Sequence, residues 1–340
     1  MRLWSLSDER IGSSKQSEVL SRALGGMTIT KKIVYTPMIF VPNIIRPLGV
    51  GINFKKSDNL VSISAEDVPD VIVSAGRRSA GVALFLKKYF MLKFARKVKL
   101  ITILNPNYSF KNFDLVILPM HDIASKERKN TRGGNVMYIN GSLCEDTIKI
   151  PDSVRNYWQD KFAGNGPFFS LIVGGNTKNG KIDPHKFAMI VEKLSNYTGD
   201  RDGTLLVSTS RRTSAECLGE IGNHLKCRHH IYDWSAPYSI PNPYYLFIEK
   251  SSIVFLTGDS ISMISEIFTV NKPAYVYMPY ELTGKKHSRF LRDLLELGVI
   301  REIKLETDKI EEFKSPSVLN ELRRVTEFIK NNILNHVDSI

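Results

Sequence analysis

A serine-rich turn followed by a carboxylate forms the sharpest chemical pattern in the chain. Residues 257–266 read TGDSISMISE and follow an apolar segment. We expect Ser260 to cap a helix, so that the N–H groups of the next residues are free to hold an anion such as phosphate. Glu266 lies nearly two turns further on, where its carboxylate could accept both hydroxyls of a ribose. The alternative interpretation is an exposed helix carboxylate.

Two more segments of the second half place glycine, hydroxyl and arginine residues directly after apolar runs. Residues 174–176 read GGN, and the N–H groups of such a turn can hold phosphate, although a plain flexible turn would look the same. Residues 210–213 read SRRT. Two hydroxyl residues around two arginines pack poorly but suit a clamp for phosphate or carboxylate. Both segments are expected at the same sheet edge as the 257–266 turn.

The first half carries a glycine-serine turn and a glycine-arginine turn. Residues 8–16 read DERIGSSKQ, where Gly12 would let the backbone approach a ligand and Ser14 and Gln16 would donate hydrogen bonds; an ordinary capped turn is the alternative. Residues 76–78 read GRR after another apolar run and suit an anion cradle at a helix start. The third glycine of the dinucleotide fingerprint is missing at its spacing, which argues against NAD.

An adjacent histidine and aspartate, His121 and Asp122, end another apolar run. A neutral histidine at the carboxyl end of a core strand could remove a proton from a substrate hydroxyl. The alternative is a structural histidine.

No metal site is expected. Asp200 and Asp202 have the spacing of a metal-binding pair, but they precede a strand on the opposite sheet edge and are interpreted as a turn. The three cysteines are odd in number and lack metal-ligand spacing, which argues against a disulfide framework and a zinc site.

These residues must be positioned by an alternation of short apolar runs and amphipathic stretches, which is typical of parallel sheets joined by helices. The pattern occurs twice. Strands are predicted at 2–7, 70–75, 99–104, 114–118, 135–139, 168–173, 204–209, 231–234, 253–256 and 274–278. Helices are predicted at 79–94, 184–197, 214–224, 244–250, 260–269, 288–297 and 317–334. The predicted fold is therefore α/β, with two Rossmann-like domains facing a cleft.

The length of 340 residues agrees with two domains. Gly, Asn and Pro near 161–167 place the boundary there, giving an N-terminal acceptor domain (1–163), a C-terminal nucleotide-sugar domain (164–315) and a C-terminal helix (316–340) that should pack back on the N-terminal domain. No signal peptide or spanning helix is recognised, so we expect a cytoplasmic protein. The net charge of +12 favours phosphates or peripheral contact with an anionic membrane.

The motifs, taken in order, resemble two groups with the GT-B architecture. One includes the N-acetylglucosaminyltransferase of peptidoglycan synthesis and lipid A disaccharide synthase; here the motif's Gly-Lys-Pro is replaced by Asn-Lys-Pro at 271–273. The chain is more similar to the family named for the plant elongated-mitochondria fission factor, over nearly its whole length. The residues that carry this resemblance are Asp8, Gly12, Gln16, Gly76, Arg77, 119–122, 135–136, Gly174, Gly175, 210–213, 259–263, Lys286 and Phe290.

The resemblance implies a metal-independent glycosyltransferase that uses a nucleotide-sugar as co-substrate and no cofactor, with an envelope glycolipid or polysaccharide as acceptor. A non-catalytic adaptor or membrane-docking protein and a nucleotide-sugar epimerase are the alternatives, and no nucleic-acid partner is expected. The expected donor-binding residues are Gly174, Gly175, Asn176, Ser210, Arg211, Arg212, Thr213, Asp259, Ser260, Ser262, Met263, Glu266 and Lys286. The expected acceptor-binding residues are Gly12, Ser14, Gln16, Gly76, Arg77 and Arg78, with His121 and Asp122 as catalytic residues.

Overall fold

The computed structural model describes residues 1–41, 47–123, 134–162, 166–237, 239–279, 284–307, 309–316 and 320–334. The chain forms two compact units. Unit 1 comprises Met1–Cys144 together with Asn320–Ile340, and unit 2 comprises Glu145–Leu319. Within the described part of the chain, no helix has the length and apolar character needed to span a bilayer.

Unit 1 is built on a parallel sheet in the order β2-β1-β3-β4-β5-β6. Its strands are β1 (Arg2–Ser7), β2 (Met27–Lys32), β3 (Val71–Ala75), β4 (Lys99–Ile103), β5 (Leu115–Pro119) and β6 (Val136–Ile139). Its helices are α1 (Ile11–Leu24), α2 (Arg77–Phe94) and α9 (Glu321–Ile329), with a π-helical turn at Lys330–Leu334 and 3₁₀ turns at Pro37–Phe40, Ala65–Asp67, Phe110–Asn112 and Met120–Asp122.

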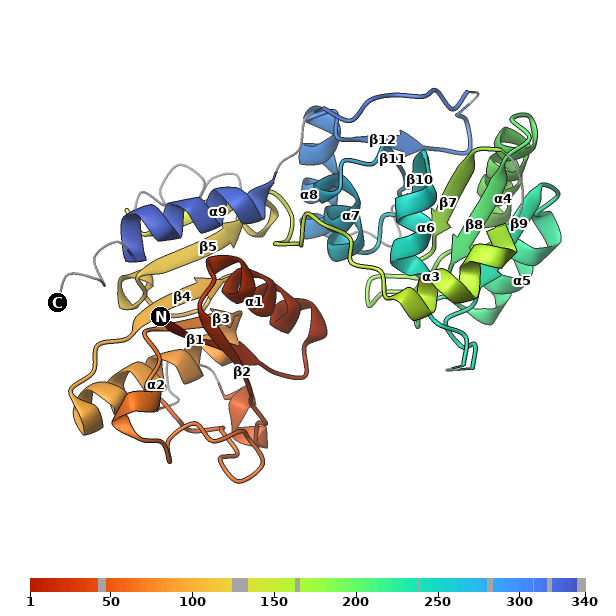
Figure 1. The fold of residues 1–340 in the computed structure, drawn as a ribbon. Coiled ribbons are helices and arrows are strands. Elements are labelled where there is room, and N and C mark those ends of the chain that lie inside the picture. Colours follow the sequence, from red (N-terminus) through yellow and green to blue (C-terminus); the bar gives the residue numbers. More distant parts are fainter. Residues whose placement is uncertain are drawn as a thin grey trace. The chain divides into compact units, whose positions relative to one another are not determined.

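Helices cover both faces of the unit 1 sheet (Figure 1). On one face Leu3 and Val73 pack with Leu20 of α1 and Val325 of α9. The other face packs against α2, including Phe90. Because successive strand residues point to opposite faces, a strand buried on both sides is a nearly continuous apolar run, as in β5 and, apart from Ser74, in β3.

Unit 2 repeats this plan with the strand order β12-β11-β10-β7-β8-β9, again parallel throughout. Its strands are β7 (Phe168–Ile172), β8 (Thr204–Ser208), β9 (Arg228–Tyr232), β10 (Ile253–Thr257), β11 (Ala274–Tyr277) and β12 (Ile300–Ile303). Its helices are α3 (Asp152–Gln159), α4 (Pro184–Gly199), α5 (Ala215–His224), α6 (Tyr244–Lys250), α7 (Ile261–Thr269) and α8 (Lys285–Glu296), with a 3₁₀ turn at Asp160–Phe162.

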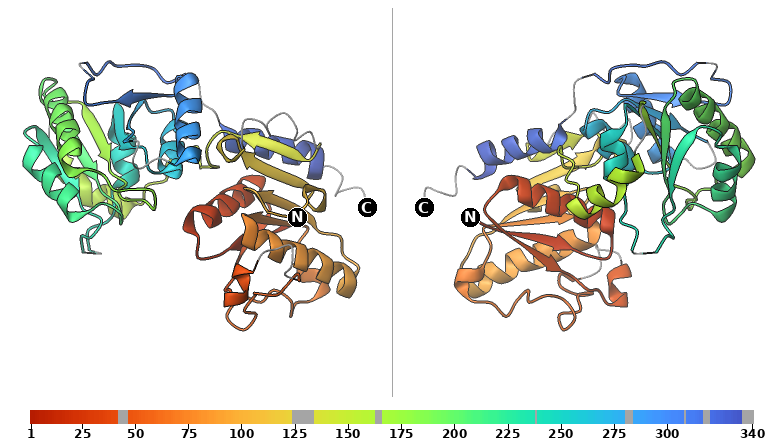
Figure 2. Two further views of the ribbon diagram at one scale, coloured as in Figure 1. Left: turned by 180° about the vertical axis from the view of Figure 1, so that it is seen from behind. Right: turned by 45° about the vertical axis from the view of Figure 1, so that its right-hand side comes forward.

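The core of unit 2 also has two faces, and Figure 2 shows helices on both sides of the sheet. Phe255 packs with Phe187 of α4 on one face, and the neighbouring Val254 packs with Phe268 of α7 and Phe290 of α8 on the other. Trp158 of α3 belongs to a smaller cluster on the second face. This packing explains why residues 145–162 lie in unit 2, whereas the sequence placed the boundary near residue 163.

The strand order of each unit reverses at one point. In unit 1 it reverses between β1 and β3, and in unit 2 between β7 and β10. In open parallel sheets, ligands bind beyond the carboxyl ends of the strands at such a switch point, because the helices leave on opposite faces there. The turns that follow these strands are therefore the places in which to look for a site.

Candidate functional site

The double glycine turn after β7 is in direct contact with two neighbouring loops. A Cβ on Gly174 would lie 2.2 Å from both carboxylate oxygens of Asp259, and a Cβ on Gly175 would lie 2.0 Å from the Arg212 carbonyl oxygen. The Gly174 N–H donates to Thr257 Oγ1 at 2.8 Å, and the Gly175 N–H donates to Asp259 Oδ2 at 3.2 Å. The two N–H groups expected to face phosphate thus donate to side chains at the end of β10. Asn176 leaves the turn, and its N–H donates to the Arg212 carbonyl at 2.9 Å.

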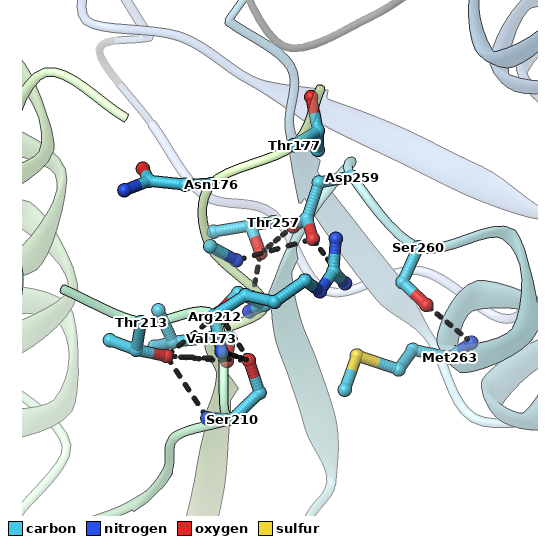
Figure 3. Close-up of polar contacts among 12 residues, drawn as sticks. Val173, Asn176, Thr177, Ser210, Arg212, Thr213, Thr257, Asp259, Ser260 and Met263 are labelled. Carbon is cyan, nitrogen blue, oxygen red and sulfur yellow. Dashed lines mark hydrogen bonds and ion pairs between the residues drawn. The ribbon is translucent and has the colours of Figure 1, made fainter. Parts of the chain in front are cut away.

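The two hydroxyl residues of the loop after β8 hold this turn in place. Ser210 Oγ donates to the Gly174 carbonyl at 2.5 Å, and Thr213 Oγ1 donates to the same oxygen at 2.7 Å. Figure 3 shows both hydroxyls directed at the turn. The arrangement fixes the loop so that the side chain of Arg212 points across the switch point.

Arg212 and Asp259 form the central ion pair of unit 2 (Figure 3). Arg212 Nη2 lies 2.6 Å from Asp259 Oδ2, and the Asp259 side chain is 0% exposed whereas that of Arg212 is 40% exposed. Thr257 Oγ1 lies 2.5 Å from Asp259 Oδ1. Burial raises the pKa of the Asp259 carboxyl, while Arg212 and the hydrogen bonds act in the opposite direction. A buried acid therefore stands beside the glycine turn.

Helix α7 begins immediately after this acid. Ser260 is its N-cap, and its hydroxyl accepts from the Met263 N–H at 3.4 Å. Ser262 lies in the first turn and is partly exposed. The helix start, with its partial positive charge, therefore lies one residue from the ion pair.

Glu266 lies further along α7, where two tyrosines of α6 meet it. Oε2 accepts from Tyr244 at 2.9 Å, and Oε1 accepts from Tyr245 at 3.1 Å. The carboxylate is held in one orientation on the helix that starts at the switch point.

The start of helix α8 adds cationic groups to the same edge. Lys286 is exposed, and His287 is partly buried. Burial lowers the pKa of His287, and Lys286 adds to this effect, whereas a hydrogen bond to the Asp259 backbone opposes it. Sequence reasoning did not select His287, although it directly follows two lysines.

An exposed arginine and tryptophan lie beside the ion pair along the edge. The Arg211 guanidinium carbon is 5.8 Å from the Trp234 ring centroid, and Trp234 is 46% exposed. Trp234 was not selected from the sequence either, although a large aromatic residue at the end of a predicted strand could have indicated it. A rigid aromatic face of this kind can stack on a planar group.

In unit 1, the predicted glycine-serine turn is part of helix α1, which begins at Ile11. Ser14 Oγ donates to the Asp8 carbonyl at 3.0 Å and accepts from the Asp8 N–H at 2.8 Å. Gln16 is buried; its Nε2 donates to the Gly12 carbonyl at 3.1 Å, and its Oε1 accepts from the Leu143 N–H at 3.2 Å. These polar groups therefore support the helix start.

The glycine-arginine turn lies at the end of β3, as the sequence indicated. Gly76 is the N-cap of α2 with φ +84°, a conformation that favours glycine. Arg77 and Arg78 occupy its first turn. Arg78 pairs with Glu9 of the β1–α1 turn, across the switch point of unit 1.

His121 and Asp122 lie in the 3₁₀ turn after β5. His121 Nε2 is 3.9 Å from Asp122 Oδ1, and the His121 side chain is only 3% exposed. A substrate hydroxyl would have to enter the protein to meet this imidazole.

Solved structures with a similar fold cover nearly the whole chain. The UDP-GlcNAc 2-epimerase of Methanocaldococcus jannaschii, solved with UDP-GlcNAc and UDP, matches with a TM-score of 0.51 and 14% identity, over 98% of this chain and 100% of that one. The glycosyltransferase SnogD from Streptomyces nogalater matches with a TM-score of 0.50 and 11% identity, over 98% and 96%. The two six-stranded parallel sheets thus form the GT-B architecture.

Two curated proteins are related in sequence. "Uncharacterized protein RP120" of Rickettsia prowazekii (strain Madrid E) is 28% identical over 97% of this chain and 98% of its own length. "Mitochondrial fission protein ELM1" of Arabidopsis thaliana is 23% identical over 74% of this chain and 61% of its own length. The model of the family described as "Mitochondrial fission ELM1" matches residues 11–333. This chain, with its two GT-B sheets, therefore belongs to the mitochondrial fission ELM1 family.

Proposed function

We propose that unit 2 binds the nucleoside diphosphate part of a nucleotide-sugar and that the protein is a metal-independent glycosyltransferase. The observation that carries the proposal is the position of Arg212, which is 40% exposed beside the start of α7 at the β7–β10 switch point. Fixed cations and helix N–H groups at that point suit a diphosphate. Arg211 and Lys286 extend the positive charge along the same edge.

The proposed reaction transfers the sugar to a hydroxyl of a glycan or glycolipid. The acceptor oxygen bonds to the anomeric carbon, the bond from that carbon to the phosphate oxygen breaks, and its electron pair leaves with the nucleoside diphosphate. Negative charge grows on the departing diphosphate, where Arg211, Arg212 and the start of α7 would stabilise it. Glu266 would accept the ribose hydroxyls.

Unit 1 would hold the acceptor through the starts of α1 and α2, with Arg77 and Arg78 at the second of these. The proton of the acceptor hydroxyl must go to a base. His121 beside Asp122 remains the proposed base, and its burial means that the 3₁₀ turn after β5 would have to open for it to act. An acceptor carried by an anionic membrane would suit the net charge of +12.

A non-catalytic adaptor is the second candidate, and a specific observation favours it. The N–H groups of Gly174 and Gly175 already donate within the protein, and the buried Asp259 carboxylate stands where phosphate would approach them. An acid at this position repels a diphosphate. The chain would then keep the GT-B scaffold with an internal ion pair in place of a ligand.

Calorimetric titration with UDP, GDP, ADP and dTDP separates the two candidates. The transferase proposal predicts binding of at least one of them, and tighter binding by Asp259→Asn, because the substitution removes a negative charge and frees Arg212 for the ligand. An adaptor predicts no binding by either protein. If Asp259→Asn instead weakens nucleotide binding, the carboxylate supports the site and does not compete with the ligand.

Product analysis then distinguishes transfer from epimerisation. Incubation with the nucleotide-sugar whose nucleotide binds best should release nucleoside diphosphate only when an acceptor is present. An epimerase would convert the sugar without an acceptor, and NMR of the anomeric and H2 signals would show the new epimer.

A further inference from the structure

Unit 1 contains a pocket that the proposed nucleotide site does not use. It has a volume of about 610 Å³ and lies beyond the carboxyl ends of β1 and β2. One wall is apolar and comes from the segment after β2, with Val34, Pro37, Ile39 and Phe40. Phe40 is 67% exposed, so this wall presents apolar surface to water.

The opposite wall of this pocket carries the carboxylate of Asp8. Its Oδ2 accepts from the Tyr35 hydroxyl at 3.2 Å, and its Oδ1 accepts from the Arg10 N–H at 2.9 Å. Burial and the neighbouring Asp8 raise the pKa of the Tyr35 phenol, so it remains a neutral donor. Ser14 Oγ also donates a longer bond to Oδ1 at 3.5 Å. Oδ2 accepts the Tyr35 bond alone, so it can still accept from a ligand hydroxyl.

Arg78 joins the apolar and polar walls. Its guanidinium carbon lies 4.9 Å from the Phe40 ring centroid and 5.8 Å from that of Tyr35, and it pairs with Glu9. The side chain is 11% exposed, and its Nε is buried without a hydrogen-bond partner among the described residues. Glu9 offsets the charge of Arg78, so the acid that remains to face a ligand is Asp8.

We propose that this pocket binds an amphipathic ligand with an apolar chain and a hydroxylated, uncharged head. The chain would lie along Phe40 and its neighbours, where it removes exposed apolar surface from water. A head hydroxyl would donate to Asp8. Arg78 and Glu9 pair with each other, and Asp8 and Lys32 add one charge of each sign to the lining, so the pocket has no net charge that would favour an ionic head. The site is complete within unit 1, so the inference does not depend on nucleotide binding by unit 2.

Titration with octyl β-D-glucoside below its critical micelle concentration tests the site directly. We expect saturable binding that is at least about tenfold tighter than that of methyl β-D-glucoside, because only the octyl compound buries a chain. Octyl sulfate, which has the same chain and an anionic head, should bind more weakly than the glucoside. Equal affinity for octyl and methyl glucoside, or tighter binding of octyl sulfate, would overturn the proposal.

The chain offers a matched pair of variants in one 3₁₀ turn, Pro37–Phe40. Phe40 lines the pocket, whereas Met38 is 52% exposed and does not line it. Phe40→Ala should weaken octyl glucoside binding about tenfold, and Met38→Ala should change it less than twofold. Equal effects of the two variants would show non-specific adsorption to the surface and would contradict the proposal.

The polar wall has its own test. Asp8→Asn keeps the size of the side chain but makes it a weaker acceptor, so it should weaken octyl glucoside binding about threefold to tenfold. The nucleotide affinity of the same variants reports on unit 2 alone and should equal that of the wild type. A result in which glucoside binding fails while nucleotide binding persists would refute the pocket assignment and leave the proposed function standing.

Discussion

Arg212 Nη2 lies 2.6 Å from Asp259 Oδ2, and only the arginine reaches the surface, with 40% of its side chain exposed against 0% for the aspartate. The arginine arrives from the loop after β8, and the aspartate directly follows β10. A bound anion can replace Asp259 as the partner of Arg212. The Asp259 carboxylate itself is held in place by hydrogen bonds from Thr257 Oγ1 and the Gly175 N–H. A bound anion and the Asp259 carboxylate therefore compete for the guanidinium of Arg212.

The competition gives a stability prediction. Arg212→Ala should lower the free energy of unfolding by about 1–3 kcal/mol, because it leaves a buried carboxylate without its cation. Adding Asp259→Asn should restore most of this loss, since the amide is uncharged and keeps an oxygen acceptor. Urea unfolding of both single variants and the double variant measures the coupling; additive effects would mean that the two side chains do not interact.

Nucleotide binding should depend on the arginines of this edge. Replacing Arg211 and Arg212 together by alanine should weaken nucleoside diphosphate binding by more than about 1 kcal/mol. The double variant Arg201→Ala with Arg228→Ala removes the same charge from residues near the amino ends of β8 and β9 and serves as the control. If both double variants lose the same affinity for the nucleoside diphosphate, the loss comes from the lower net charge of the protein and not from these two arginines.

The raised pKa of Asp259 predicts a pH dependence of stability. Its folded-state pKa lies above the unfolded value, so between the two the folded state binds more protons. The contribution of Asp259 to the free energy of unfolding must then fall as pH rises through this interval. Urea unfolding of the wild type and of Asp259→Asn at several pH values above roughly 4 checks whether this contribution falls as the pH rises. A difference that grows in favour of the wild type at higher pH would contradict it.

Glu266 should recognise ribose. Glu266→Ala should weaken ribonucleotide binding by roughly 1.5–3 kcal/mol and should leave binding of a 2′,3′-dideoxy analogue nearly unchanged. Tyr244→Phe removes one of its present donors and tests whether that bond orients the carboxylate. Titration of both ligands completes the cycle. If the alanine variant loses equal affinity for both ligands, the residue supports packing with α6.

His121→Ala should reduce turnover about 10²-fold while donor binding persists, as expected for loss of a general base. Because the side chain is 3% exposed, thermal unfolding must be measured in parallel. Full activity combined with a lowered melting temperature would make His121 a structural residue.

The α/β alternation and most strands could be predicted from the sequence, because strands buried on both faces are continuous apolar runs. Strand β2 was missed because it lies at a sheet edge and its sequence, MTITKK, is largely polar and partly exposed. Strand β12 is also an edge strand, and two of its four residues are charged. Helix α3 was not recognised because it has only eight residues and buries only two of them, Val154 and Trp158, which makes a weak apolar pattern.

The candidate site was only partly accessible to sequence reasoning. That 174–176, 210–213 and 257–260 follow strands can be deduced from apolar runs and turns. The pairing of Arg212 with Asp259 depends on the order β10-β7-β8, which no local pattern encodes. The contacts of Glu266 could not be deduced either, because they depend on the packing of α7 beside α6, which carries both tyrosine partners.

The C-terminal helix α9 has a consequence for how the chain is made. Its residues Val325 and Ile329 complete a core with Leu3, Leu20 and Val73, and Glu321 accepts from the Asn140 N–H at 2.8 Å. During synthesis, unit 1 must wait for these residues until all of unit 2 has been translated, although domains usually fold in order from the N-terminus. The nascent chain therefore leaves Leu3, Leu20 and Val73 without the α9 side chains that complete their core throughout that interval.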